Sequence, residues 1–173
     1  QHLKDLTENS LGDASKALLE ALSSFFNEIV LSGNVPDGLC PIFYGGSLLA
    51  LSKPDGGVRP IAIGCTLRRL AGKICMRRMK DKCVSLFYPS QLGVGTPLGA
   101  EIAIHCCRTY IGQNAHSNKV VLKVDFSNAF NSVRRDKILQ NVKKYSPELF
   151  PFVYQAYAKP SFLQFGDKKL LSR

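Results

Sequence analysis

Apolar residues recur at helical spacing in several stretches of the chain, and these stretches are predicted to be helices. The first covers residues 14–31 and the second residues 66–87. In the second, one face is predicted to be buried and carries Leu67, Ala71, Cys75, Met79 and Cys83. The opposite face carries a stripe of basic residues, Arg69, Lys73, Arg77 and Lys80. Further helices are expected over residues 100–111 and, interrupted by Pro147, from about 134 to 158.

Short apolar runs joined by glycine-containing turns predict two β-hairpins. Residues 47–52 and 58–63 flank a Pro-Asp-Gly-Gly turn, and residues 162–165 and 168–172 flank Gly166-Asp167. Pro60 has no N–H for a strand ladder, so its strand is expected at a sheet edge. Residues 119–125 are apolar and β-branched, and they are predicted to form a buried strand that ends at Asp125. We therefore expect an α+β fold.

Composition narrows the class of protein. The chain has 173 residues, of which 45% are hydrophobic and 21% charged, as in a folded domain rather than a disordered segment. No apolar run approaches the roughly 18 residues that span a bilayer, so no membrane partner is expected. The six cysteines form no C-x-x-C pair and are predicted to be reduced thiols that serve as small core residues. This use of cysteine agrees with an intracellular, reducing compartment, the nucleus or the cytoplasm.

Positive charge is concentrated in the later part of the chain. The formal net charge is +10, but residues 1–60 hold 4 basic and 7 acidic side chains. Residues 61–140 hold 13 basic and 4 acidic side chains, and residues 141–173 hold 6 and 2. Such a surplus indicates either a surface that faces a polyanion or a solvated basic face without a partner. Charge alone does not choose between the two.

Three residues stand at positions that suit phosphate or metal chemistry. A carboxylate at the end of a buried strand, such as Asp125, is positioned to bind a hard cation such as Mg²⁺. Aspartate is also a good helix N-cap, and the spacing alone favours that role. Lys53 and Arg59 flank the glycine turn of the first hairpin, where two cations suit a triphosphate. Exposed charges on either side of a turn are also common.

Two segments together resemble a known family. The segment Leu51–Ile61 (LSKPDGGVRPI) is similar to the fingers motif of reverse transcriptases, most closely in the non-LTR retrotransposon and group II intron branch. The segment Val124–Val133 (VDFSNAFNSV) resembles the first palm motif of the same enzymes. Between these two segments lie a basic helix and a Gln-x-Gly segment, Gln91-Leu92-Gly93, in the order that the family has them. The likeness covers roughly residues 25–173.

The resemblance implies a role for individual residues. Asp125 is then the first carboxylate that binds Mg²⁺ in a two-metal polymerase. Phe126 offers its backbone to the incoming nucleotide, and Phe130 lies beneath the nucleotide sugar. Lys53 and Arg59 hold the triphosphate. The stripe Arg69, Lys73, Arg77 and Lys80 is in place to follow template phosphates, although the family pattern does not specify these four positions.

The resemblance also implies a division of the chain. Residues 1–118 are expected to form an N-terminal helix and the fingers, and residues 119–173 the start of the palm. In the family, a glycine-rich motif and then two adjacent aspartates follow the last hairpin. No two aspartates are adjacent in this sequence, and Arg173 precedes both features. The chain is therefore expected to be the N-terminal part of an RNA-directed DNA polymerase, inactive alone. Its partners are then an RNA template, a DNA primer, deoxynucleoside triphosphates, and the remaining palm and thumb.

Two alternatives from other classes stay open. In the first alternative, the chain is a non-catalytic nucleic-acid-binding module or a domesticated retroelement remnant. In the second it is a structural fragment that self-associates through an unfinished sheet edge. The resemblance does not reveal the host element or the template RNA.

Overall fold

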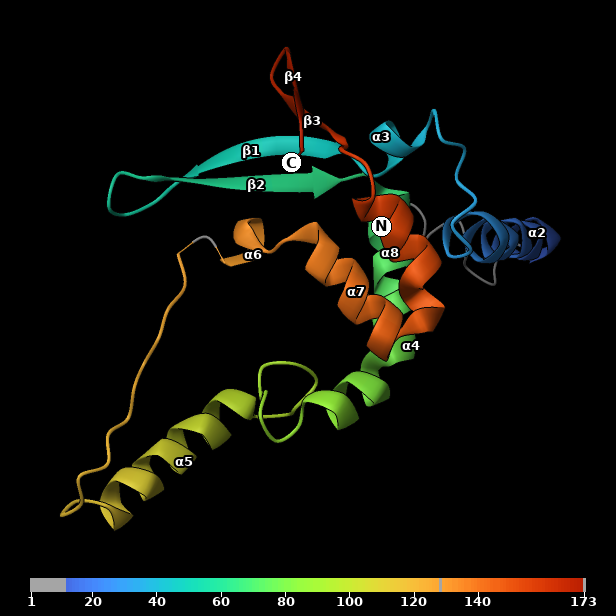
Figure 1. Ribbon diagram of the computed structural model, residues 1–173. Coiled ribbons are helices and arrows are strands. Elements are labelled where there is room, and N and C mark those ends of the chain that lie inside the picture. Colours follow the sequence, from blue (N-terminus) through green and yellow to red (C-terminus); the bar gives the residue numbers. More distant parts are fainter. Residues whose placement is uncertain (1–11, 128, 173) are drawn as a thin grey trace. The chain divides into compact units, whose positions relative to one another are not determined.

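The computed structural model describes residues 12–127 and 129–172, and its architecture is mixed α+β with a four-stranded sheet (Figure 1). The chain forms two compact units. Unit 1 comprises Gln1–Gly72 and Val133–Arg173, and unit 2 comprises Lys73–Ser132. The predicted α+β class is confirmed. The boundary expected at residue 118 stays a prediction, because compactness does not distinguish fingers from palm.

Unit 1 contains most of the predicted helices. The segment predicted at 14–31 forms α2 (Gly12–Ser24) and continues as a π-helix, η2 (Phe25–Val30), in which Phe26 and Val30 are buried. A short helix, α3 (Cys40–Phe43), leads into the sheet. The later helices are α7 (Arg135–Tyr145), the 3₁₀ turn η3 (Pro147–Leu149) and α8 (Phe150–Tyr157). The predicted interruption at Pro147 is confirmed.

Both predicted hairpins form, and they combine into one sheet with the strand order β2-β1-β3-β4. The first hairpin is β1 (Gly46–Ser52) with β2 (Val58–Gly64), and the second is β3 (Phe162–Phe165) with β4 (Lys168–Leu171). Strand β2 lies at the edge, as Pro60 predicts. The hairpins join where β1 pairs in parallel with β3. Only two residue pairs make this junction, Gly46 with Leu163 and Ser47 with Gln164.

Two adjacent glycines permit close backbone contacts at the start of β1. A Cβ on Gly45 would overlap the carbonyl oxygen of Phe162 and would lie 2.8 Å from the carbonyl oxygen of Pro41. A Cβ on Gly46 would lie 2.7 Å from the carbonyl oxygen of Ile63. Backbone atoms of neighbouring strands cannot move aside as a flexible side chain can. Glycine is therefore required at position 45 for the second hairpin to approach β1, and at position 46 for β1 to pair closely with β2.

The core of unit 1 surrounds the buried residue Tyr44. The amide of Gln155, on α8, accepts a hydrogen bond from the Val35 N–H at 3.2 Å and donates one to the Val35 carbonyl at 2.9 Å. The Tyr44 hydroxyl donates to the same amide oxygen at 3.2 Å, and burial raises the pKa of Tyr44. Arg68 Nη1 donates to the Tyr44 carbonyl at 2.7 Å. These bonds attach α8, and the start of the helix over Thr66–Phe87, to the segment that leads into β1.

Unit 2 contains three helical segments. The long helix α4 (Thr66–Phe87) begins in unit 1 and continues into unit 2, where α5 (Gly99–Gln113) and α6 (Ala129–Ser132) follow. The basic face predicted for α4 is confirmed, and its apolar face is confirmed in part, because Leu67 and Cys83 are only half-buried. Its buried residues are Ala71, Cys75 and Met79, and the four residues of the basic stripe are exposed. None of the described helices is long and apolar enough to cross a membrane.

Residues 119–125 do not form the buried strand that their sequence predicts. They have no strand partner among the residues that the structure describes, and Val120 and Leu122 are 85% and 82% exposed. Apolar, β-branched side chains favour a strand only where a neighbouring strand pairs with the backbone and another surface covers the side chains. The described sheet consists of the two hairpins alone and supplies neither. The prediction was wrong for this reason.

The cysteine prediction is confirmed in part. All six thiols are free. Cys40 and Cys75 are buried, and burial raises the pKa of both thiols. Three others are exposed and are therefore not core residues: Cys65, Cys106 and Cys107. An apolar sequence neighbourhood does not determine which side of a helix a cysteine occupies.

We predict that Gly45→Ala destabilises the chain by about 2–3 kcal/mol, because the new methyl group meets the backbone of the neighbouring strand. Gly72→Ala is the control. Gly72 lies inside α4, and a methyl group there would meet nothing within 4 Å. Alanine at this position is therefore expected to stabilise the helix by about 0.5–1 kcal/mol. Urea unfolding followed by circular dichroism measures both. Equal stability of the Gly45→Ala variant and the wild-type chain would contradict the close junction.

Candidate nucleic-acid interface

The tip of the β1–β2 hairpin is closed by backbone hydrogen bonds around its glycine turn. The Lys53 N–H donates to the Gly57 carbonyl at 2.8 Å, and the Gly56 N–H donates to the Lys53 carbonyl at 3.1 Å. Gly56 has φ of 79°, which favours glycine. The Gly57 N–H donates to Asp55 Oδ1 at 3.0 Å. The turn therefore holds the backbone of Lys53 in a defined position.

The register of the hairpin places both of its cations on the same face. Arg59 pairs with Leu51, and directly opposite residues point to the same side of a sheet. Lys53 follows Leu51 by two residues, so the alternation of side chains returns it to that side. We call this surface the charged face. Its residues are Ser47, Leu49, Leu51, Lys53, Arg59, Ile61 and Ile63.

The two faces of the hairpin differ in chemistry. The other face carries no charged residue and consists of Leu48, Ala50, Ser52, Val58, Pro60 and Ala62. On the charged face, the apolar residues between the tip and the base remain exposed: Leu49, Leu51, Ile61 and Ile63. Cations beside exposed apolar surface suit a ligand that has both anionic and flat apolar parts. Nucleotides have this combination.

The basic stripe of α4 offers a second cationic surface. Its members are spaced four, four and three residues apart, so they share one side of the helix. From Arg69 to Lys80 they extend over about 16 Å of helix axis. Among the residues that the structure describes, none of the four forms an ion pair. Their charges are therefore not neutralised within the described chain.

The residues of the proposed palm motif lie in unit 2, outside any strand. Asp125 is exposed, and its carboxylate accepts no hydrogen bond from any residue in the described ranges. Phe126 is exposed, and Phe130, on α6, is 97% exposed. Across the part of the chain that the structure describes, no three His, Cys, Asp or Glu side chains group as metal ligands. Asp125 alone therefore does not make a metal site.

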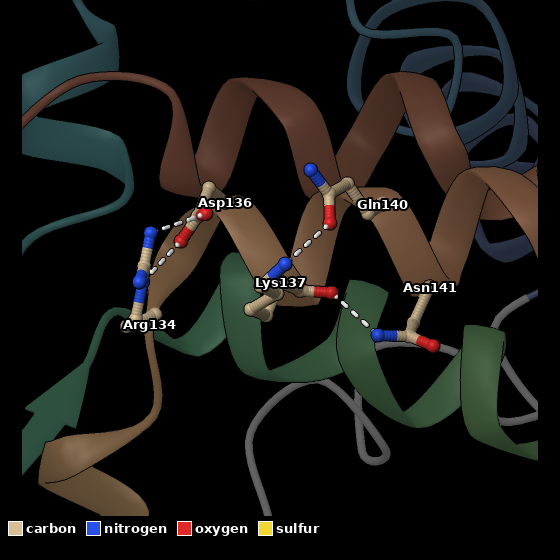
Figure 2. Close-up of polar contacts among 5 residues, drawn as sticks. All are labelled: Arg134, Asp136, Lys137, Gln140 and Asn141. Carbon is tan, nitrogen blue, oxygen red and sulfur yellow. Dashed lines mark hydrogen bonds and ion pairs between the residues drawn. The ribbon is translucent and has the colours of Figure 1, made fainter.

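In the segment that follows the proposed palm motif, Arg134 and Lys137 form hydrogen bonds with neighbouring side chains. Arg134 forms two hydrogen bonds with Asp136, Nε to Oδ1 at 3.0 Å and Nη2 to Oδ2 at 2.8 Å (Figure 2). This pairing lowers the pKa of Asp136 and raises that of Arg134. Lys137 Nζ donates to Gln140 Oε1 at 3.2 Å, and Asn141 Nδ2 donates to the Lys137 carbonyl at 2.8 Å. The exposed side of α7 is thus bonded largely to itself.

Arg135 was not singled out from the sequence, yet it connects three elements. Its guanidinium donates to the carbonyl of Tyr157, the last residue of α8, at 3.4 Å, and to that of Lys159 just beyond the helix at 3.2 Å. It also donates to Ser172 Oγ at 3.0 Å, and the Ser161 N–H donates to the same hydroxyl at 2.8 Å. A cation is favourable at a helix C-terminus. Arg135 therefore positions the second hairpin against α7 and α8.

The structure brings together Lys53 and Arg59, and it aligns the four basic residues along α4. Asp125, Phe126 and Phe130 belong to unit 2, whereas the hairpin belongs to unit 1. Comparisons of the chain with protein-family models, with curated proteins and with solved structures found no match. Its function is therefore inferred from its own residues.

We predict that Phe130→Ala changes the free energy of unfolding by less than about 0.5 kcal/mol, because the ring buries almost nothing. Phe26→Ala is the matched comparison, since Phe26 is 4% exposed. Its loss is expected to cost about 3–5 kcal/mol. Chemical denaturation of both variants measures the difference. A similar loss in both would place Phe130 in the core and remove it from consideration as a ligand contact.

Proposed function

We propose that this chain is the fingers and first palm part of an RNA-directed DNA polymerase, and that on its own it binds nucleic acid. The observation that carries the proposal is the hairpin, in which Lys53 and Arg59 share one face at a glycine turn. The hairpin coincides with the segment that resembles the fingers motif. The unneutralised stripe on α4 follows it in the order that the resemblance implies.

The charged face is suited to the phosphates of a nucleotide. Arginine binds a phosphate through two parallel N–H donors, and lysine adds a compact positive charge. Asp55 is the nearest carboxylate in sequence, and it accepts a hydrogen bond from the Gly57 N–H. A triphosphate at the tip would therefore meet two cations of fixed register. The exposed leucine and isoleucine side chains below the tip offer apolar contact to a base.

The described residues supply only part of the ligand set for the Mg²⁺ that the resemblance implies. A carboxylate is the oxygen ligand that Mg²⁺ prefers, and Asp125 supplies one. Two-metal phosphoryl transfer needs further carboxylates to hold both ions a few ångströms apart. The residues that the structure describes contain no such group. We therefore assign no catalytic step to Asp125 in this chain and propose it as one of several Mg²⁺ ligands in a complete enzyme.

The exposure of the two motif phenylalanines supports a ligand-facing role. Large aromatic side chains favour the interior of a protein, and their burial stabilises the fold. Phe126 and Phe130 remain 75% and 97% exposed. Accessible rings next to a carboxylate are consistent with the proposed contacts to a nucleotide and its sugar.

A second candidate function is nucleic-acid binding without catalysis, as in a domesticated remnant. The single carboxylate at Asp125 favours it. The cationic surfaces serve both functions equally, so binding alone does not separate them. Self-association through the sheet edges is less favoured, because Pro60 on β2 and Lys168 and Lys169 on β4 disfavour pairing with another strand. Light scattering against concentration tests this third possibility.

We predict that charge reversal on the α4 stripe weakens RNA binding at least tenfold at low salt. The variant replaces Arg69, Lys73 and Arg77 with glutamate. Each lost phosphate contact removes about 0.7 from the slope of log affinity against log salt for a single strand. The slope should therefore become shallower by about 2. Fluorescence anisotropy with a labelled oligoribonucleotide measures affinity across a salt series.

The control for this variant makes the same change in net charge elsewhere. It replaces three exposed lysines of α7 with glutamate: Lys137, Lys143 and Lys144. We expect at most a threefold loss of affinity from it, through the general field of the protein. Equal losses in the two triple variants would show that the stripe is only part of a solvated basic surface.

We also predict that the isolated chain does not extend a primer on an RNA template with Mg²⁺ and deoxynucleoside triphosphates. One carboxylate does not hold the two ions that the reaction requires. Incorporation of a labelled nucleotide, compared with a reaction without protein, is the measurement. Template-dependent incorporation above that background would refute the assignment of an incomplete active site.

A further inference from the structure

A second cationic site lies at the opposite end of the charged face from the hairpin tip. An open pocket of about 560 Å³ forms where the sheet meets the first turn of α4. We call it the base pocket. Its polar and charged lining consists of Ser47, Cys65, Thr66, Arg69, Gln164 and Lys169, and no aspartate or glutamate of the described ranges lines it. All of these residues belong to unit 1.

The strand register explains why these side chains gather. Ser47 pairs with Ile63 on one side and with Gln164 on the other, and Gln164 pairs with Lys169. Paired residues share a face, so the four side chains form one row across all four strands. The row belongs to the charged face, because Ser47 and Ile63 are members of it. Arg69 adds a second cation from α4.

Lys169 is held in place on this row. Its Nζ lies 3.6 Å from the centroid of the Phe162 ring, which also lines the pocket. Neither Lys169 nor Arg69 forms an ion pair with any residue in the described ranges. Lys168 precedes Lys169 and pairs with Phe165, so its side chain points to the other face of the sheet. Only one of the two adjacent lysines therefore belongs to the base pocket.

The lining matches the chemistry of a phosphate diester. Two cations provide charge, and the hydroxyls of Ser47 and Thr66 provide neutral hydrogen-bond donors. The Gln164 amide donates to the Gly166 carbonyl at 2.6 Å, which leaves its second N–H as a further donor. None of the described residues that line the pocket carries a carboxylate that would repel an anion. The volume lies within the range of sites for small molecules or single nucleotides.

We propose that the base pocket binds a backbone phosphate of a single-stranded nucleic acid, with Arg69 and Lys169 as its charge partners. The inference rests on the proposed function, and it adds a binding position that the family resemblance does not assign. Ser47 lies in β1 and Lys53 directly follows that strand, six residues or about 20 Å away. A single nucleotide does not span that distance, but a strand of several nucleotides does. The continuous charged face therefore favours a strand over a free nucleotide.

The test measures binding of a fluorescein-labelled oligouridylate of about 12 nucleotides to the full chain. We expect Lys169→Gln and Arg69→Gln each to weaken binding about three- to tenfold and to reduce the salt slope by about 0.7. Lys168→Gln removes the same charge from the adjacent position on the other face, and it should change affinity less than twofold. Lys169→Arg keeps the charge and should bind nearly as the wild-type chain does.

Two results would overturn the proposal. One is an equal loss of affinity in the Lys168→Gln and Lys169→Gln variants, which would reduce the effect to overall charge. The other is unchanged oligonucleotide binding in both pocket variants. Circular dichroism of each variant establishes that it is folded, and recovery in Lys169→Arg separates lost charge from lost structure.

A parallel titration with a labelled deoxynucleoside triphosphate distinguishes the sources of phosphate. If Lys169→Gln weakens triphosphate binding but leaves the oligonucleotide unaffected, the pocket binds free nucleotides and the strand proposal is wrong. Binding of the oligonucleotide that is independent of Lys169 but sensitive to the α4 reversal removes the pocket and leaves the proposed function standing. A wild-type chain that binds neither probe refutes the proposed function itself.

Discussion

The close backbone contact between β1 and β3 is the constraint on which the rest of unit 1 depends. Gly46 and Leu163 are 117 positions apart in the sequence, and only two residue pairs join their strands. The contact exists because Gly45 has no side chain that would meet the carbonyl oxygen of Phe162. It merges two hairpins, each marginal alone, into a four-stranded sheet. The row of side chains that defines the base pocket crosses this same junction.

The remaining contacts of unit 1 hold the junction in place. Gln155 satisfies the N–H and the carbonyl of Val35 through one side chain, in the manner of a strand pair. Arg135 acts in a similar way on the other side, between the end of α8 and Ser172. Buried polar groups must be hydrogen-bonded. Each of these side chains therefore satisfies backbone groups and also fixes the relative positions of the segments that it joins. Gln155 connects the segments of unit 1 that precede and follow unit 2 in the sequence, whereas Arg135 connects elements within the later segment.

Some basic residues form hydrogen bonds or ion pairs within the protein and others form no ion pair, a difference that the net charge does not show. Arg68, Arg134 and Arg135 donate to protein atoms in unit 1, and Lys159 pairs with Asp37 at 3.1 Å. These cations support the fold. Lys53, Arg59, Arg69 and Lys169 form no ion pair among the described residues, and the first two, with Lys169, lie on one face of the sheet. The proposed function and the base pocket both depend on this second group.

The sequence by itself determined the local elements. The periodicity of residues 66–87 predicted both faces of α4, and the two glycine turns predicted both hairpins, because these signals depend on neighbours within a few residues. It also identified Lys53 and Arg59, whose shared face follows from hairpin register. Tertiary structure alone decided that the hairpins join in parallel, that Lys169 and Arg69 line one pocket, and that Arg135 acts within the fold. It also overruled the strand at 119–125, since a strand exists only where distant backbone pairs with it. Such long-range pairing leaves no signature in local sequence.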